Sequence, residues 1–172
     1  ADPTRQLDSR DRVVVLGDGK GHKATKCVIG MIGSGNYASG TLIPAFRDAG
    51  ANLGVLASAA GVSSVHSGKK FGFESATTDA DAVPANESVD TVVVATRHDT
   101  HARYAIPALN AGKHVFVEKP LAINREELDQ IEAAYAAAGG GPILMVGFNR
   151  RFSPLTEKLK ELLDAKSEPK SF

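Results

Sequence analysis

Short apolar runs alternate with longer segments of helical pattern along the chain, which predicts repeated strand-helix-strand units. Aliphatic residues dominate each apolar run, as in strands that are buried on both faces of a parallel sheet. The predicted strands span 27–32, 52–57, 90–95, 114–117 and 143–146. The predicted helices span 36–50, 62–70, 100–110 and 124–138, and a last one begins after Ser153. We therefore expect a mostly parallel sheet that is flanked by helices.

Three stretches are harder to interpret from the pattern. Residues 13–16 could form a strand, and the glycine-rich residues behind them are typical of a turn or linker. Residues 71–75 give only a weak strand pattern. Pro107 is expected to kink or shorten the helix at 100–110. We expect residues 1–26 to be a junction or linker, 27–150 to form the main domain, and 151–172 to begin a further region.

A glycine pair follows the first predicted strand directly, in the order Gly33-Ser34-Gly35-Asn36-Tyr37-Ala38. This junction of strand and helix is where a dinucleotide pyrophosphate binds in open parallel sheets. Gly33 permits the tight turn, Gly35 leaves room for the phosphates, and Ala38 lets the helix pack closely on the strand. Backbone N–H groups at the helix start then face the anion. We therefore expect this loop to bind NAD or NADP.

The second part of a dinucleotide site is an acid about 20 residues after the glycines, which binds the ribose hydroxyls. No Asp or Glu lies between Asp48 and Glu74, and the second predicted strand ends at Ser58. Ser58 can hydrogen-bond a ribose or a 2′-phosphate, and it does not repel the phosphate, so NADP is permitted. No arginine follows it to clamp that phosphate. Ser58 could equally be no more than the end of a strand.

The composition of the chain argues against nucleic acid, metal and membrane as partners. The 172 residues carry 20 Lys and Arg against 20 Asp and Glu, so we expect no basic surface for nucleic acid. Cys27 is the single cysteine and lies in an apolar run where a small hydrophobe would serve; a disulfide scaffold, a redox pair and a metal site are not expected. No apolar stretch reaches the roughly 20 residues of a membrane-spanning helix, and the first residues are not signal-like. We expect a cytoplasmic protein.

Polar residues follow two of the predicted strands, and ligands of open parallel sheets bind at the carboxyl ends of strands. Thr96-Arg97-His98-Asp99-Thr100-His101 follows one strand, and Glu118-Lys119-Pro120 follows the next. With the glycine loop and Gly147-Phe148-Asn149-Arg150-Arg151-Phe152, these motifs resemble the Gfo/Idh/MocA family of oxidoreductases over about residues 26–163. The stretch Ala111 to Ala122, AGKHVFVEKPLA, is the most specific part of the resemblance.

The resemblance implies a role for each residue of these motifs. Lys119 takes the position of the catalytic lysine, and Glu118 lines the nicotinamide pocket. Thr96, His98 and His101 fall in a loop beside the cofactor, where Arg97-His98 replaces the usual Pro-Asn. From the residues alone, a lysine between a buried strand and a proline is held at the cleft, where it can hydrogen-bond a substrate hydroxyl. A plain surface lysine, and histidines that bond at a helix start, are the competing interpretations.

The fold that the resemblance implies is a Rossmann-like, doubly wound α/β sheet, and the function is that of the nucleotide-binding domain of an NAD(P)-dependent oxidoreductase. A sugar, cyclitol or related polyol is the expected substrate, and a homo-oligomer is possible. Members carry a second α/β domain for the substrate after the segment matching Gly147 to Phe152. We therefore expect the 172 residues to be an excised or truncated part that binds cofactor without turning over a sugar.

Two motifs favour one subgroup of the family. TRHDxH and GFNRRFSP resemble members in which this module follows a zinc-type alcohol dehydrogenase-like region, with residues 1–26 as the junction. Two other functions remain open: a non-catalytic nucleotide-binding scaffold or sensor, and a methyltransferase that binds S-adenosylmethionine at the glycine loop. Neither gives a reason for the Glu118-Lys119-Pro120 segment.

Overall fold

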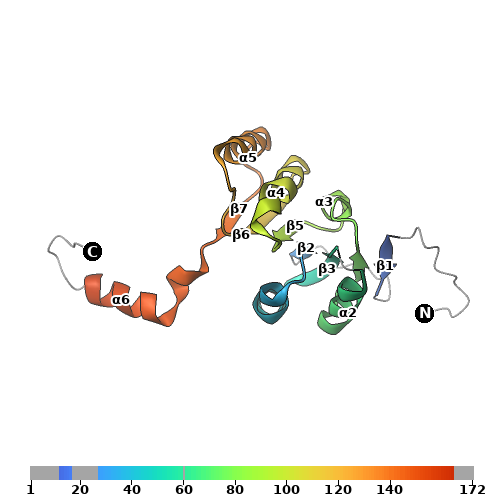
Figure 1. Cartoon of the computed structure of the whole chain (residues 1–172), viewed down its shortest axis with the longest axis horizontal. Helices are drawn as coiled ribbons and strands as arrows, with labels where there is room; N and C mark the ends of the chain where they lie inside the picture. The colour runs from blue at the N-terminus through green and yellow to red at the C-terminus, as the bar shows by residue number, and fades with distance from the viewer. Residues whose placement is uncertain (1–11, 17–26, 60, 165–172) are drawn as a thin grey trace, which may run out of the picture.

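The centre of the molecule is one seven-stranded sheet in the order β1-β4-β3-β2-β5-β6-β7 (Figure 1). The computed structural model describes residues 12–16, 27–59 and 61–164. Strands β2 to β7 run parallel, and β1 pairs antiparallel with β4 at one edge. The strands are β1 (Val13–Val15), β2 (Val28–Ile32), β3 (Asn52–Ala57), β4 (Ser75–Thr77), β5 (Thr91–Val94), β6 (His114–Glu118) and β7 (Leu144–Gly147).

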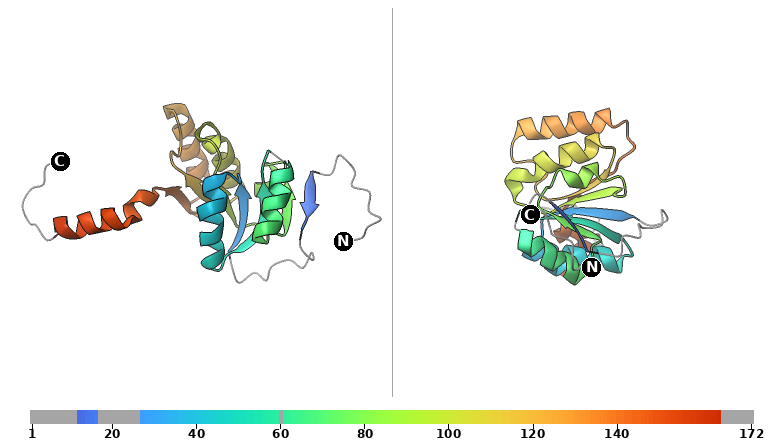
Figure 2. Two further views of the ribbon diagram at one scale, coloured as in Figure 1. Left: turned by 60° about the horizontal axis from the view of Figure 1, so that its bottom comes forward. Right: turned by 90° about the vertical axis from the view of Figure 1, so that its right-hand side faces the viewer.

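Helices cover both faces of this sheet, as the two views of Figure 2 show. Helices α1 and α2 pack on one face, and α3, α4 and α5 pack on the other. The doubly wound, Rossmann-like fold that the sequence predicted is therefore confirmed. The helices are η1 (Ala38–Leu42, a π-helical turn), α1 (Ile43–Asp48), α2 (Gly61–Phe71), α3 (Ala82–Ala85), η2 (His98–Thr100), α4 (His101–Asn110), α5 (Arg125–Ala137), η3 (Asn149–Phe152) and α6 (Pro154–Asp164).

The central strands send alternate side chains into two apolar layers. On β5, Val92 and Val94 pack with α4 and α5, whereas Val93 packs with the layer under α1 and α2. All three valines are fully buried. Burial of one such side chain stabilises the fold by about 1.5 to 3 kcal/mol. The alternation fixes the register of the sheet, because a shift by one residue would exchange the two layers.

The structure differs from the sequence expectations at several elements. Strand β2 begins at Val28, and Cys27 is exposed rather than part of the apolar run. The weak strand expected at 71–75 lies at Ser75–Thr77 instead, because Phe71 and Phe73 turn into the core as the helix ends. Pro107 lies inside α4, which still reaches Asn110. The short helix α3 was not predicted.

The amino-terminal stretch is described only in part. Residues 13–15 form a strand, as the apolar pattern allowed, while the glycine-rich segment and most of the predicted junction lie outside the described residues. No helix in the described ranges has both the length and the apolar character that crossing a membrane requires.

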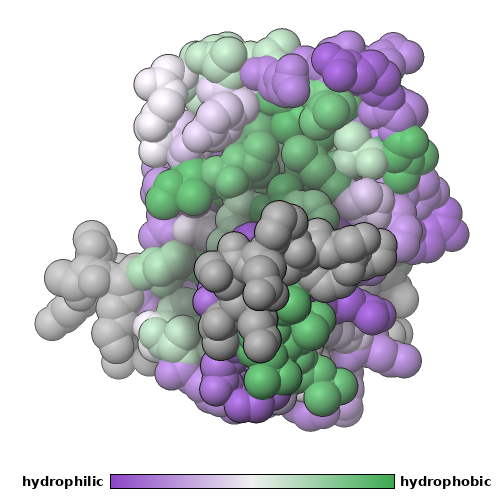
Figure 3. Space-filling view, turned by 90° about the vertical axis from the view of Figure 1, so that its left-hand side faces the viewer, coloured by the Kyte–Doolittle hydropathy of each residue, from purple (hydrophilic) through white to green (hydrophobic). Residues whose placement is uncertain are grey.

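Helix α6 extends away from the sheet (Figures 1 and 2), and none of its residues is buried. Besides its leucines, further exposed apolar side chains lie in or directly beside β7 and η3. Figure 3 shows apolar surface on this side of the molecule. We call this set the apolar face; its members are Ile143, Met145, Phe148, Phe152, Leu155, Leu159 and Leu162.

Candidate functional site

A cavity of about 760 Å³ lies at the carboxyl ends of β2, β3, β5 and β6. The strand order reverses between β2 and β5, because the chain runs outward from β2 through β3 and β4 and then returns to β5. A crevice at such a reversal is the usual ligand site of open α/β sheets. Nine of the residues singled out from the sequence line it: Gly33, Gly35, Asn36, Tyr37, Ser58, Thr96, His98, Glu118 and Lys119.

The glycine loop forms the floor of the cavity at the end of β2. Gly33 has a φ of +104°, and a Cβ there would lie 2.4 Å from the carbonyl oxygen of Ala95; only glycine fits. A Cβ on Gly35 would meet no atom within 4 Å, so the backbone at Gly35 is open to the cavity. Ser34 does not line the cavity; its carbonyl oxygen accepts a hydrogen bond from Ser39 Oγ at 3.0 Å.

Tyr37 connects the glycine loop with the segment that follows β7. Asn149 Nδ2 donates a hydrogen bond to Tyr37 Oη at 2.5 Å, and Asn149 and Arg150 also line the cavity. The sequence reasoning used these two residues only for the family resemblance. Their position after a strand end was the signal that could have placed them in the site.

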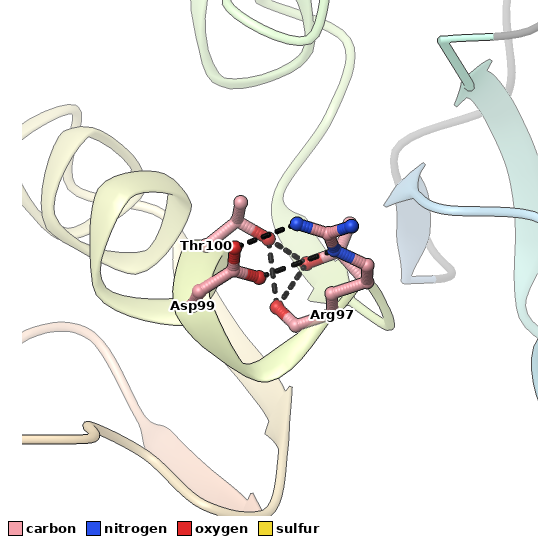
Figure 4. Close-up of polar contacts among 4 residues, drawn as sticks. Arg97, Asp99 and Thr100 are labelled. Atoms are coloured by element: carbon pink, nitrogen blue, oxygen red, sulfur yellow. Dashed lines mark hydrogen bonds and ion pairs between the residues drawn. The ribbon is translucent and has the colours of Figure 1, made fainter.

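The loop after β5 is held by contacts within itself (Figure 4). The Arg97 guanidinium donates to both carboxylate oxygens of Asp99, at 2.8 and 3.4 Å. Thr100 Oγ1 lies 2.8 Å from both Thr96 Oγ1 and the Arg97 carbonyl oxygen. The hydrogen bond from Arg97 holds the pKa of Asp99 below its ordinary value. This pair gives the loop a fixed shape where Arg97 departs from the family pattern.

His101 is fully buried and does not line the cavity. Its Nδ1 lies 2.6 Å from the carbonyl oxygen of Pro120, and its Nε2 lies 3.2 Å from that of Thr96. The ring therefore joins the loop after β5 to the loop after β6. The prediction that His101 contacts the cofactor does not fit this placement, because both ring nitrogens face backbone oxygens. The geometry favours a positioning role, in which His101 holds the two loops.

Glu118 is the last residue of β6, and Lys119 follows it directly. Both residues line the wall of the cavity. Glu118 is buried, and its Oε1 has no hydrogen-bond partner among the described residues. This oxygen is enclosed beside β7, because a Cβ on Gly147 would lie 2.6 Å from it. An unpaired buried carboxylate oxygen is costly. The Lys119 side chain is exposed to the cavity, and the Lys119–Pro120 peptide bond is cis.

The opposite end of the cavity, at β3 and β4, is lined by Ser58, Ala59, Thr78 and Ala80. Among the described residues that line the cavity, Glu118 is the one acid, and it lies at the end of β6. No carboxylate therefore lines the end at β3 and β4. The polar side-chain groups at this end of the cavity are the hydroxyls of Ser58 and Thr78. Thr78 was missed from the sequence, because it follows the short strand β4, which the pattern placed a few residues too early.

Comparison with known proteins gives a match over most of this domain. Residues 27–148 match the model of an oxidoreductase family with an NAD-binding Rossmann fold. An inositol 2-dehydrogenase of Saccharopolyspora erythraea is 43% identical over 77 residues, which are 45% of this chain and 22% of that protein.

Solved structures agree in fold. A 3-ketoreductase of Actinomadura kijaniata in complex with NADP has a TM-score of 0.73 at 26% identity, and the match covers 83% of this chain and 45% of that one. A levoglucosan dehydrogenase in complex with NADH and levoglucosan has a TM-score of 0.71 at 28% identity, over 81% and 40% of the two chains. The chain thus spans less than half the length of these relatives.

Proposed function

Because the chain belongs to the Gfo/Idh/MocA family of oxidoreductases, we propose that its cavity binds NAD or NADP and serves an enzyme that oxidises or reduces a sugar or cyclitol. One observation carries the proposal. The glycine loop at the end of β2 and the Glu118-Lys119 pair at the end of β6 line the same cavity, at the point where the strand order reverses.

The residues present fit a nicotinamide dinucleotide. The open backbone at Gly35 and the helix that starts behind it suit the pyrophosphate. Glu118 lines the wall of the cavity, where a carboxylate can accept a hydrogen bond from an amide donor such as the nicotinamide carboxamide. Ser58 and Thr78 provide hydroxyl groups for the ribose at the other end. A cavity of about 760 Å³ is in the range of small-molecule and cofactor sites.

The bound cofactor would accept a hydride from the substrate carbon, or return one. Lys119 stands at the same wall, where its amine can hydrogen-bond the reacting hydroxyl and take its proton as the carbonyl forms. Glu118 would fix the orientation of the ring, and His101 would hold the two loops that carry Thr96 and Lys119. Precise orientation of this kind can lower a barrier by roughly 7 to 11 kcal/mol.

The substrate class rests on the relatives. The matched proteins include dehydrogenases of inositol and of levoglucosan, which are polyols or sugar derivatives. The chain spans less than half of these proteins, so the substrate and the activity of the whole protein are part of the proposal. A cytoplasmic location and a homo-oligomer remain predictions from the sequence.

Titration of the 172-residue chain with NADH, NADPH and S-adenosylmethionine tests the cofactor assignment. We expect calorimetry to show binding of at least one nicotinamide dinucleotide and none of S-adenosylmethionine. Binding of S-adenosylmethionine alone would point to a methyltransferase, and binding of none of the three would contradict the proposal.

The role of Lys119 is tested in the whole protein. Lys119→Ala should lower kcat for polyol oxidation by about 10² to 10⁴, the usual contribution of a positioned acid or base, while the Kd for cofactor changes less than about threefold. Lys69→Ala, on the exposed surface of α2, is the control. Equal kcat in the two variants would remove Lys119 from the chemistry.

A further inference from the structure

Strand β1 places Arg12 one strand beyond the end of the cavity at β3 and β4, although β1 lies outside the region that matches the family. In this structure the Arg12 side chain is not among those that line the cavity. Because β1 runs antiparallel to β4, its first residues lie at the carboxyl end of that strand. Arg12 immediately precedes β1. Its carbonyl oxygen accepts a hydrogen bond from Thr78 N–H at 3.4 Å, and Thr78 lines the cavity.

Arg12, Thr78 and Ser58 form one row across the strand ends. Thr77 is opposite Val13 on one side and Ala57 on the other, so the next row contains these three residues. Ser58 also lines the cavity. Neighbouring strands lie about 4.8 Å apart, so an extended arginine side chain at Arg12 can reach over Thr78 toward Ser58.

Two contacts fix β1 in this position. Leu16 N–H donates to the carbonyl oxygen of Glu74 at 2.6 Å. The Leu16 side chain packs over Gly68 of α2 so closely that a Cβ on Gly68 would lie 2.4 Å from Leu16 Cδ1. Arg12 is therefore attached to the sheet, at a defined distance from the cavity.

Asp79 is the partner of the Arg12 side chain among the residues that the structure describes. Arg12 Nη1 lies 3.3 Å from Asp79 Oδ2, and Asp79 Oδ1 accepts the Asp81 N–H at 3.1 Å. Both oxygens of the carboxylate are thus in use. A guanidinium has five N–H donors, and one contact with Asp79 leaves enough for an oxyanion.

We propose that Arg12 binds the 2′-phosphate of NADP, together with the hydroxyl groups of Ser58 and Thr78. The inference rests on the proposed function and makes it more specific. A guanidinium matches the geometry of a phosphate. No carboxylate lines this end of the cavity, and the nearby carboxylate of Asp79 is paired with Arg12 itself. No arginine follows Ser58 in the sequence, and the edge strand β1 would supply one in its place.

Calorimetric titration of the full chain with NADPH and NADH tests the inference, with Arg12→Gln as the variant. NADPH binding should weaken about tenfold, as for loss of a hydrogen bond to a charged group, and NADH binding should change less than twofold. Arg12→Lys should keep part of the NADPH affinity, because it keeps the charge without the planar fork. Arg47→Gln is the control, since Arg47 is also exposed and paired with a carboxylate, that of Asp48, but lies on α1, outside the row of Arg12, Thr78 and Ser58.

Two further ligands separate the possible failures. 2′,5′-ADP should bind the wild type more tightly than 5′-AMP, and Arg12→Gln should remove most of that difference. If both dinucleotides bind and Arg12→Gln leaves the NADPH to NADH ratio unchanged, the inference is wrong and the proposed function stands. If neither dinucleotide binds the wild type, the proposed function fails and the inference fails with it.

Discussion

Gly35 is the residue whose side-chain position decides whether phosphates can approach the backbone. A Cβ there would meet no protein atom within 4 Å, so a larger residue fills the cavity and does not strain the fold. Gly35→Val should weaken NADH or NADPH binding more than tenfold, while the free energy of unfolding changes by less than about 1 kcal/mol. Calorimetry and urea denaturation measure the two quantities.

Gly40→Val is the matched control for that substitution. Gly40 also has open space at its Cβ position, but it does not line the cavity. Unchanged affinity in Gly35→Val would show that the pyrophosphate lies elsewhere.

Ser58 stands where an acid usually binds the ribose hydroxyls. Ser58→Asp would add an acceptor for the 2′-hydroxyl and repel a 2′-phosphate. We expect NADPH affinity to fall about tenfold or more while NADH affinity stays the same or rises. Ser58→Asn, with similar size and no charge, is the control. A Ser58→Asp variant that still binds NADPH as the wild type does would place the ribose away from β3.

At this scale the sequence predicted positions at strand ends better than contacts between distant residues. Gly33 and Gly35 line the cavity at the end of β2, and their spacing after a predicted strand was the signal; their role in binding a cofactor stays a prediction. His101 was expected beside the cofactor but is buried between two carbonyl oxygens. Its partner Pro120 is 19 positions away, and no local pattern reports such a contact.

Asp90 joins two central strands at their starts. Its carboxylate accepts the Val28 N–H at 2.9 Å and the Thr91 hydroxyl at 2.6 Å. Burial alone would raise the pKa of Asp90, but the hydrogen bonds from Thr91 and Val28 outweigh it and lower the pKa below 3.8. The stabilisation by Asp90 is therefore present above about pH 4 and is lost as the pH falls through the lowered pKa.

Asp90→Ala should reduce the free energy of unfolding at pH 7 by about 1 kcal/mol. Because Asp90 becomes protonated at low pH, the difference from the wild type should shrink as the pH falls below about 4 and through the lowered pKa of Asp90. Denaturation at several pH values measures this. Asp129→Ala, which removes an exposed ion pair with Arg125 on α5, should cost at most about 0.5 kcal/mol. An Asp90→Ala difference that is constant with pH would contradict the assignment.

Most elements followed from the alternation of apolar runs and helical patterns. Strands β2, β3, β5 and β6 are apolar and mostly buried, so their sequences give a clear strand pattern. Strand β4 and helix α3 have only 3 and 4 residues, too few for a period to show. The placement of β1 beside β4 is a pairing between distant segments, which the local pattern of β1 does not encode.

The apolar face is the feature of the whole molecule that is least compatible with a free monomer. Leu155, Leu159 and Leu162 are 85%, 51% and 58% exposed on one helix, and large apolar patches on protein surfaces mark sites of association. We expect the isolated 172-residue chain to associate as its concentration rises, as measured by sedimentation velocity.

Leu155→Glu combined with Leu159→Glu should shift that equilibrium toward the monomer by at least about tenfold in Kd. Tyr135→Glu is the control, because Tyr135 is exposed on α5, outside the apolar face. A wild-type chain that stays monomeric at high concentration would contradict the expectation.

The position of β1 at the edge of the sheet also determines when Arg12 can reach its place during synthesis of the chain. Asp79, the partner of Arg12, lies 67 positions later in the chain. At about 5 to 20 residues per second, a ribosome needs roughly 3 to 13 s to add that stretch. β1 cannot pair before β4 has been synthesised, so Arg12 reaches its place at the end of β4 only after that interval. A nascent chain would therefore contain the glycine loop for several seconds before Arg12 could take the role proposed for it.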